Sequence, residues 1–471
     1  MLWNLAKYRN QLVVIDEYGD AITYGELAEE GERIAAAVGK RCLVFSLCTN
    51  AIGSVVGYVS FINSGIVPVL LNAHLEEGLL QNLLAAYQPS YLWLPEKQAD
   101  QFDNMERVYG SYGYCLLHTP YHRAYSLFPE LALLLTTSGS TGSAKLVRQS
   151  YSNIKANAES IVQYLELDDT ERPITTLPMN YTYGLSIINS HLLVGAAILT
   201  TDKSLTQKEF WHFFRQREAT SFGGVPYTYE MLDRMRFQRM NLPSLRTMTQ
   251  AGGKLLPELH KKFAEYAEEH GKNFVVMYGQ CEATARMGYL PADKAIEKCG
   301  SMGVAIPGGA FQLLDANGQI IQKPHTTGEL VYRGPNVTLG YAESGEDLAK
   351  GDERHGILET GDMAQFDEDG YYYIVGRKKR FLKIYGNRVN LDEIDQMVKA
   401  EFAHTDFVSA GVDDHMYLFV TDDSATEAVK AFVTAKTGLN PAAFQTVVIQ
   451  EIPKNDSGKI LFAELRKYYE S

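Results

Sequence analysis

The sequence predicts an α/β protein: a large N-terminal domain of doubly wound mixed sheets with a small antiparallel β piece, then a small C-terminal α+β domain. Three observations support this. Short apolar runs alternate with helical periodicity over the first two thirds, turn-rich short strands follow at 310–375, and a basic run precedes the last part of the chain. Strands that alternate with helices are typical of parallel, doubly wound sheets.

The N-terminal elements are expected from their apolar patterns. Short uncharged runs suit strands that are buried on both faces, and apolar residues at helical spacing indicate helices between them. The expected strands are 42–47, 66–71, 91–94, 174–177, 197–200 and 274–277, and the expected helices are 24–38 and 76–86.

The C-terminal elements follow a change of pattern. Turn signals at 316–318, 327–328 and 368–370 indicate antiparallel strands. The basic run 377–380 is typical of a solvated linker, so we expect domains at 1–376 and 381–471. Within the second, we expect helices at 391–402 and 425–437 and strands at 407–412 and 417–420.

Composition excludes several classes of protein. The 471 residues are 45% hydrophobic and 21% charged, which excludes a disordered chain or a coiled coil. The net charge of −13 argues against a nucleic-acid partner. Five cysteines without a CxxC pair favour a reducing, cytoplasmic setting. We see no signal peptide, and polar residues interrupt the charge-free stretch 42–75, so we expect no membrane insertion.

The sharpest local motif follows the apolar run 131–135. Small residues, hydroxyls and a lysine in this order suit a backbone nest for phosphate, although such a run alone is also compatible with a flexible surface loop. It is not a Walker A loop, because Ala144 and Leu146 flank its lysine. The candidate phosphate-binding residues are Thr137, Ser138, Gly139, Ser140, Thr141, Gly142 and Lys145.

Four weaker motifs follow at 250–254, 277–284, 359–379 and 453–460. Together, in this order, the five motifs resemble the adenylate-forming superfamily, which includes acyl- and aryl-CoA synthetases, the adenylation domains of peptide synthetases, and luciferases. The resemblance runs from about Thr23 to Lys459. It implies that the protein forms an acyl-adenylate from a carboxylic acid and ATP with Mg²⁺, releases pyrophosphate, and transfers the acyl group to a pantetheine thiol.

The resemblance also implies roles for single residues. The loop 137–145 would wrap the β- and γ-phosphates. Glu282 would hold Mg²⁺, and Lys459 would contact the acyl carboxylate and the α-phosphate. The implied adenine and AMP site comprises Gly252, Gly253, Lys254, Tyr278, Gly279, Cys281, Asp362 and Arg377, of which Tyr278 would stack on adenine and Asp362 would bind the ribose hydroxyls.

The small domain would turn about a hinge at 377–380. Lys379 occupies the hinge position, and Gly386 would border the pantetheine tunnel. The chain ends twelve residues after Lys459, so we expect no carrier domain and an acceptor that acts in trans.

Several positions depart from the family pattern. Cys281 replaces a threonine, and the loss of one hydrogen bond, about 0.5–1.5 kcal/mol, would weaken activity without abolishing it. Ala144 and Leu146 replace proline and glycine in the phosphate loop, and Tyr151 and Tyr181 replace common histidines. These departures leave a second interpretation open, in which the protein is an inactive relative that only binds a nucleotide or an acyl-adenylate.

The expected acyl pocket lies between two walls. Residues 178–194, with Tyr181 and Gly184, contain no Asp or Glu, which favours a neutral fatty or aryl acid. Gly223 and Gly224 on the facing wall either leave room for the tail or serve a tight turn. Amino-acid activation, as in D-alanine ligases, remains an alternative, and the acceptor is either CoA or an acyl carrier protein.

Overall fold

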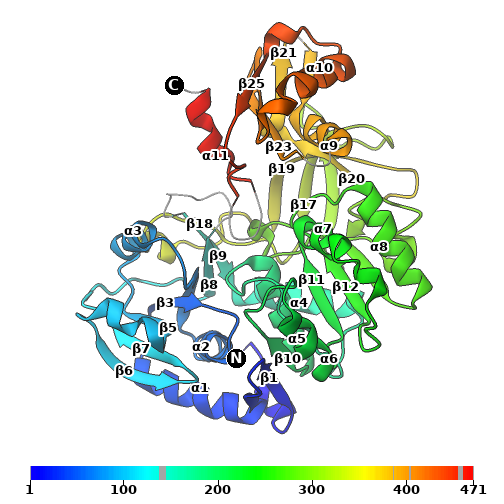
Figure 1. Ribbon diagram of the computed structural model, residues 1–471. Coiled ribbons are helices and arrows are strands. Elements are labelled where there is room, and N and C mark those ends of the chain that lie inside the picture. Colours follow the sequence, from blue (N-terminus) through cyan, green and yellow to red (C-terminus); the bar gives the residue numbers. More distant parts are fainter. Residues whose placement is uncertain (1, 137–144, 386, 403–404, 455–459, 470–471) are drawn as a thin grey trace. The chain divides into compact units, whose positions relative to one another are not determined.

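The computed structural model describes residues 2–136, 145–385, 387–402, 405–454 and 460–469 (Figure 1). The chain divides into two compact units. The first comprises Met1–Cys299, Gly303–Ala310 and Arg333–Leu358, and the second comprises Gly300–Met302, Phe311–Tyr332 and Glu359–Ser471. Most of the predicted antiparallel piece therefore belongs with the C-terminal residues, and the proposed hinge at 377–380 lies within the second unit.

The first unit contains an eight-stranded mixed sheet in the order β18-β9-β8-β4-β3-β5-β7-β6. Parallel strands form its centre, and antiparallel strands form both edges. The strands are β3 (Leu43–Cys48), β4 (Val67–Asn72), β5 (Tyr91–Pro95), β6 (Glu106–Ser111), β7 (Tyr114–His118), β8 (Leu131–Thr136), β9 (Leu146–Ser150) and β18 (Gly340–Ala342). The predicted doubly wound mixed sheet is confirmed.

The helices of this region explain the charge-free stretch. Helix α2 (Ile52–Asn63) is buried along almost its whole length, between strands β3 and β4 in sequence. Helices α1 (Tyr24–Val38) and α3 (Glu77–Tyr87) are amphipathic, and a small sheet of β10 (Ile198–Thr200), β1 (Leu12–Asp16) and β2 (Ala21–Thr23) lies in the same unit. Among the described residues, no helix has the length and apolar character needed to cross a bilayer.

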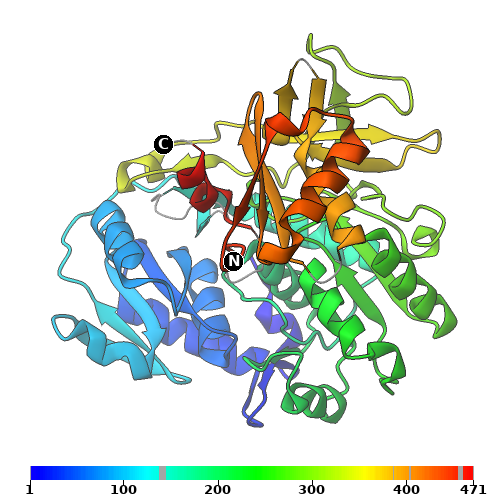
Figure 2. The same cartoon turned by 45° about the horizontal axis from the view of Figure 1, so that its top comes forward.

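A second sheet of the first unit has the order β11-β12-β13-β14-β15. Strands β11 (Ser221–Gly224), β12 (Thr247–Gln250) and β13 (Asn273–Tyr278) are parallel, whereas β14 (Gly288–Tyr289) and β15 (Val304–Ala305) are antiparallel. The helices that follow or precede these strands are α4 (Tyr151–Leu165), α5 (Thr182–Val194), α6 (Lys208–Gln216), α7 (Pro226–Arg234) and α8 (Pro257–Glu269). Figure 2 shows these green strands and helices in a second view.

The strand predicted at 174–177 is wrong. Only Pro173 and Ile174 form bridges, which are isolated, to Ser221 and Leu199. A few backbone hydrogen bonds, such as that from the Thr175 N–H to the Leu199 carbonyl, accompany these bridges. The hydroxyls of Thr175 and Thr176 donate to the carbonyls of Thr201 and Gly223, and no regular ladder continues.

The second unit is built on antiparallel pairing. Its strands β16 (Ala310–Leu314), β17 (Gly328–Arg333), β19 (Ile357–Phe366) and β20 (Tyr372–Arg377) form one sheet, in which β19 and β20 run antiparallel as predicted. The elements that follow are β21 (Phe381–Ile384), β22 (Asn387–Asn390), α9 (Leu391–Glu401), β23 (Phe407–Val412), β24 (His415–Val420), α10 (Thr426–Thr437), β25 (Phe444–Val448) and α11 (Phe462–Leu465).

The basic run is not wholly solvated. Arg377 ends β20 and is exposed, but Arg380 is 7% exposed and forms ion pairs with Asp392 and Asp395. The linker interpretation is therefore wrong for Arg380. Two carboxylates provide the countercharge that its burial requires.

Candidate active site

Part of the predicted site lies outside the described residues. This applies to Thr137, Ser138, Gly139, Ser140, Thr141 and Gly142 of the phosphate loop, to Gly386 and to Lys459. The described flanks show that the loop joins adjacent antiparallel strands, because Thr136 of β8 pairs with Leu146 of β9. Lys145 therefore emerges at the end of the central sheet of the first unit.

One tyrosine brings two predicted site residues together. The hydroxyl of Tyr341 donates to Glu282 Oε1 at 2.7 Å, and Lys145 Nζ lies 3.9 Å from the centroid of the Tyr341 ring. Burial and the neighbouring Glu282 raise the pKa of Tyr341 to about 12, so this hydroxyl stays a donor at neutral pH. The structure thus joins the predicted phosphate lysine to the predicted metal carboxylate through a residue that sequence reasoning missed.

The backbone around Glu282 is also fixed. Its carbonyl accepts hydrogen bonds from the backbone N–H and the hydroxyl of Thr338 and from Arg354 Nη1, each at 3.0 Å. The Arg354 guanidinium lies 4.6 Å from the centroid of the Tyr341 ring. Asn336 Nδ2 donates to the Ala283 carbonyl. The segment 336–354 therefore holds the acid in place from several sides.

The predicted adenine segment follows β12. Gln250 is 0% exposed, and its Nε2 donates to the carbonyls of Gly253 at 2.9 Å and Ala251 at 3.3 Å. Gly252 adopts a φ of +85°, which favours glycine, and it is exposed together with Gly253 and Lys254. Gln250 thus shapes an open glycine surface; the motif 250–254 includes this residue, but its positioning role is seen only in the structure.

Tyr278 ends the neighbouring parallel strand β13. Its ring is half-buried, and Gln280 Nε2 donates to its hydroxyl at 3.3 Å. A Cβ atom on Gly279 would lie 1.7 Å from the Ala285 carbonyl oxygen, so only glycine fits there. Cys281 is buried at the start of the 3-10 turn η4 (Cys281–Ala283). The carboxyl ends of β12 and β13, paired at Gln250 and Val276, therefore carry both parts of the predicted adenine site.

The glycines of the predicted acyl pocket allow close packing. Gly223 and Gly224 lie in β11 without a positive φ, so the tight-turn alternative is wrong. A Cβ on Gly223 would lie 2.9 Å from the Tyr183 hydroxyl, which itself bonds to Thr249 Oγ1 at 2.8 Å. The space beside Gly223 is thus occupied by Tyr183.

The other pocket residues lie on the facing wall. Tyr181 is half-buried immediately before α5, and a Cβ on Gly252 would lie 2.8 Å from its hydroxyl. A Cβ on Gly184 would lie 2.4 Å from the Pro178 carbonyl oxygen, so glycine is required where α5 begins.

The predicted ribose residues lie in the second unit. Asp362 of β19 and Arg377 of β20 are register partners, and Arg377 Nε lies 3.2 Å from Asp362 Oδ1. Asp362 is buried and Arg377 is exposed. Lys379 lies in the 3-10 turn η7 (Lys378–Arg380) that follows. An oriented carboxylate suits vicinal hydroxyls, which donate to it.

The profile of the AMP-binding enzyme family matches residues 2–342. The chain belongs to this family, as its motifs predicted. It is 29% identical over 343 residues to an oxalate–CoA ligase of Arabidopsis thaliana, a match that covers 70% of this chain and 66% of that protein. It is 28% identical over 353 residues to a 2-succinylbenzoate–CoA ligase of Bacillus mycoides (strain KBAB4), covering 72% of this chain and 71% of that protein.

Solved structures share the fold over the whole length. The o-succinylbenzoate CoA synthetase of Bacillus subtilis, in complex with its acyl-adenylate, superposes with a TM-score of 0.77 at 21% identity and covers 97% of this chain and 95% of its own. ATP-bound MatB of Rhodopseudomonas palustris gives a TM-score of 0.78 at 21% identity, with 99% and 97% coverage. The predicted fold class is confirmed.

Proposed function

We propose that this protein is an AMP-forming acid–thiol ligase. It joins a carboxylic acid to ATP as an acyl-adenylate, releases pyrophosphate, and transfers the acyl group to a pantetheine thiol. The observation that carries the proposal is the contact of Glu282 and Lys145 with one tyrosine, Tyr341, in an AMP-binding enzyme. Relatives named as CoA ligases favour CoA over a carrier protein as the acceptor.

The described residues fit ATP and Mg²⁺. The exposed glycines 252–253 and the Tyr278 ring offer a flat surface for a purine. Glu282 offers hard oxygen ligands, and Oε1 of its carboxylate accepts a hydrogen bond from the Tyr341 hydroxyl. No cluster of three or more His, Cys, Asp or Glu side chains suited to a metal occurs among the described residues, so Mg²⁺ would take its other ligands from phosphates and water. When bound, Mg²⁺ supplies positive charge against the triphosphate.

The carboxylate of the acid and the triphosphate of ATP are both anions, and the protein's residues must offset the repulsion between them. An oxygen of the acid attacks the α-phosphorus, the bond to pyrophosphate breaks, and an acyl-phosphate anhydride forms. The thiol sulfur then attacks the activated carbonyl carbon, the thiol proton is lost, and AMP leaves. Lys145 and, in this proposal, Lys459 offset the negative charge, while Gln250 and Tyr341 orient the groups that bind ATP.

We also propose the roles predicted for the hinge, the pantetheine tunnel and the ribose site. Residues 377–380, with Lys379, would be the hinge of a C-terminal domain at 381–471, and Gly386 would border the pantetheine tunnel. Asp362 and Arg377 would hold the ribose and phosphates of AMP. We also propose a cytoplasmic location, in keeping with five cysteines of which none forms a disulfide.

Pyrophosphate release with Lys459→Ala tests the proposal. Removal of a cation that contacts the reacting groups should lower the rate by about 10²–10³ while ATP binding persists. Lys454→Ala, which alters another C-terminal lysine, is the matched control. Equal pyrophosphate release by Lys459→Ala and the wild type would contradict the role of Lys459.

A second experiment tests the alternative that this protein binds a nucleotide without activating an acid. Cys281→Thr restores a hydroxyl, which is a better hydrogen-bond donor than a thiol, and should raise the rate of adenylation roughly 2- to 13-fold. If neither the wild type nor this variant releases pyrophosphate with any acid, yet both bind ATP, the protein is a binding module.

A further inference from the structure

Arg286 is a buried cation without a carboxylate. It follows η4 in the first unit and is 3% exposed. Nε donates to Ser186 Oγ at 3.1 Å, Nη1 donates to the Tyr164 hydroxyl at 3.0 Å, and the guanidinium carbon lies 5.2 Å from the Tyr183 ring centroid. Met277 Sδ lies 3.2 Å from Nη1. We call Arg286 and these four neighbours the Arg286 cluster. Within the described residues, Arg286 forms no ion pair with a carboxylate.

The other buried arginines of the described chain behave differently. Arg148 forms an ion pair with Glu353, and Arg380 forms ion pairs with Asp392 and Asp395. Such pairing is the rule, because transfer of a lone charge from water to a protein interior is strongly unfavourable. Arg286 departs from this rule.

The neighbours of Arg286 do not supply the missing negative charge. Burial raises the pKa of Tyr183 to about 12 and raises that of Tyr164, so both phenols are neutral at physiological pH even beside the guanidinium. His191, on the same helix α5, is also neutral, because burial lowers its pKa to about 4. The Arg286 cluster therefore carries one uncompensated positive charge.

The Arg286 cluster lies in the wall of the proposed acyl pocket. Tyr183 and Ser186 belong to α5, within the segment 178–194 predicted to line that pocket. Tyr183 and Met277 share an apolar cluster with Val225 and Ala251, and the half-buried Tyr181 packs against the same cluster. Nε and Nη1 are engaged within the Arg286 cluster, so Nη2 is the guanidinium nitrogen that can donate to an anionic group on the tail of a substrate.

We propose that Arg286 binds a second carboxylate of the acid substrate, so that the substrate class is a dicarboxylic acid. This inference rests on the proposed function. One carboxylate is joined to the α-phosphate, and the other stays ionised and pairs with Arg286. The absence of Asp and Glu from 178–194 agrees with this class, because an acid there would repel such a tail. This proposal gives the substrate an anionic tail, whereas the sequence favours a neutral fatty or aryl acid.

The test is ATP-dependent pyrophosphate release, with hydroxylamine as the acceptor. The substrates are straight-chain monocarboxylic acids, each paired with the dicarboxylic acid of the same length, together with benzoate and its dicarboxylic counterparts. We compare kcat/KM for each pair in the wild type, Arg286→Met and Arg286→Lys. Arg148→Met, which alters a carboxylate-paired buried arginine, is the control for general damage to the fold.

We expect the wild type to prefer one dicarboxylic acid by about 30-fold or more, since loss of one partner of a buried charge pair has an effect of this order. Arg286→Met should abolish the preference, Arg286→Lys should retain part of it, and Arg148→Met should leave the ratio unchanged. Equal or better use of monocarboxylic acids by the wild type, or a preference that survives in Arg286→Met, would overturn the inference and leave the ligase function standing. No release with any acid would overturn both.

Discussion

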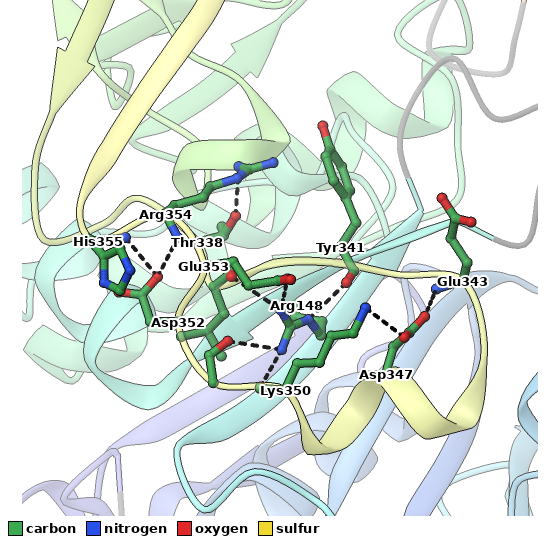
Figure 3. A network of polar contacts seen from close by, with 12 residues as sticks. Arg148, Thr338, Tyr341, Glu343, Asp347, Lys350, Asp352, Glu353, Arg354 and His355 are labelled. Carbon is green, nitrogen blue, oxygen red and sulfur yellow. Dashed lines mark hydrogen bonds and ion pairs between the residues drawn. The ribbon is translucent and has the colours of Figure 1, made fainter.

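Two buried arginines of the first unit have opposite surroundings. Arg148, which is 0% exposed, donates to the carbonyls of Leu339, Tyr341, Lys350 and Gly351 and pairs with Glu353 (Figure 3). We call this set the Arg148 network. Among the described residues, the side chain of Arg286 contacts two hydroxyls, a thioether and an aromatic ring.

The difference separates a structural cation from one available to a ligand. In the Arg148 network, one side chain ties β9 to β18 and to the loop that follows it, and the ion pair is complete within the protein (Figure 3). In the Arg286 cluster, the hydrogen bonds hold the guanidinium in place, but no carboxylate in the described part of the chain balances its charge. Burial alone therefore does not reveal the role of an arginine, whereas its partners do.

Replacement of the two arginines by methionine should have unequal effects on stability. Arg148→Met leaves several buried carbonyls without a donor and Glu353 without its partner, so we expect a loss of roughly 3–5 kcal/mol in the free energy of unfolding. Arg286→Met removes an unpaired charge and keeps apolar volume, so its free energy of unfolding should change by less than about 1 kcal/mol. Urea unfolding of both variants measures the difference.

A larger loss in the free energy of unfolding for Arg286→Met than for Arg148→Met would contradict this distinction between the two arginines. It would mean that the neutral hydrogen bonds of the Arg286 cluster contribute more to stability than the ion pair and carbonyl contacts of Arg148. In that case, Arg286 would be a structural residue like Arg148.

Local patterns in the sequence predicted the fold well where one segment determines its own structure. The helix predicted at 24–38 from apolar periodicity matches α1, and the structure shows why its ends are sharp: Thr23 and Glu26 form a capping box at its start, and Gly39, with a φ of 74°, ends it. The strand predicted at 174–177 is wrong because its bridges end at Ile174 and the two threonines that follow bond through their hydroxyls, which apolar periodicity does not report.

The candidate site was less predictable because its contacts are distant in sequence. Tyr341 and Glu282 are 59 positions apart, and Arg286 and Ser186 are 100 apart. The motif around Glu282 drew attention to an acid, but nothing in the sequence indicates that Tyr341 would orient it. The search for acids in 178–194 likewise overlooked a cation that comes from another segment.

Tyr341 links the two environments, because its carbonyl belongs to the Arg148 network and its hydroxyl donates to Glu282 of the candidate active site. Tyr341→Phe keeps the first contact and removes the hydrogen bond to Glu282. Since hydrogen bonds to charged groups contribute roughly 1.5–3 kcal/mol, we expect about a 10-fold or greater loss in adenylation and a higher Mg²⁺ requirement. Pyrophosphate release titrated with Mg²⁺ measures both.

Tyr87→Phe is the matched control for this prediction. Its hydroxyl donates to the Ala342 carbonyl at 2.8 Å, one residue from Tyr341. Tyr87→Phe should lower the free energy of unfolding modestly without changing the Mg²⁺ dependence of pyrophosphate release. An unchanged Mg²⁺ requirement in Tyr341→Phe would show that Glu282 does not depend on this hydroxyl.

The smallest expected effect concerns the charge of Arg286 itself. Burial is the main cause that lowers the pKa of His191 to about 4, and the Arg286 charge adds to it. The unfolded chain binds a proton on His191 as the pH falls through about 6.5, whereas the folded protein does so only near 4. The free energy of unfolding should therefore fall across this window as the pH decreases.

Arg286→Met should make this decline slightly shallower, because the loss of a nearby positive charge moves the folded-state pKa of His191 back toward its ordinary value. His191→Leu should remove the contribution altogether and thereby isolate it from other titrating groups. Urea unfolding at a series of pH values between about 7 and 4 compares the three proteins. An identical or steeper decline in Arg286→Met would mean that the charge of Arg286 is already balanced within the protein, which would remove the reason to assign it an anionic ligand.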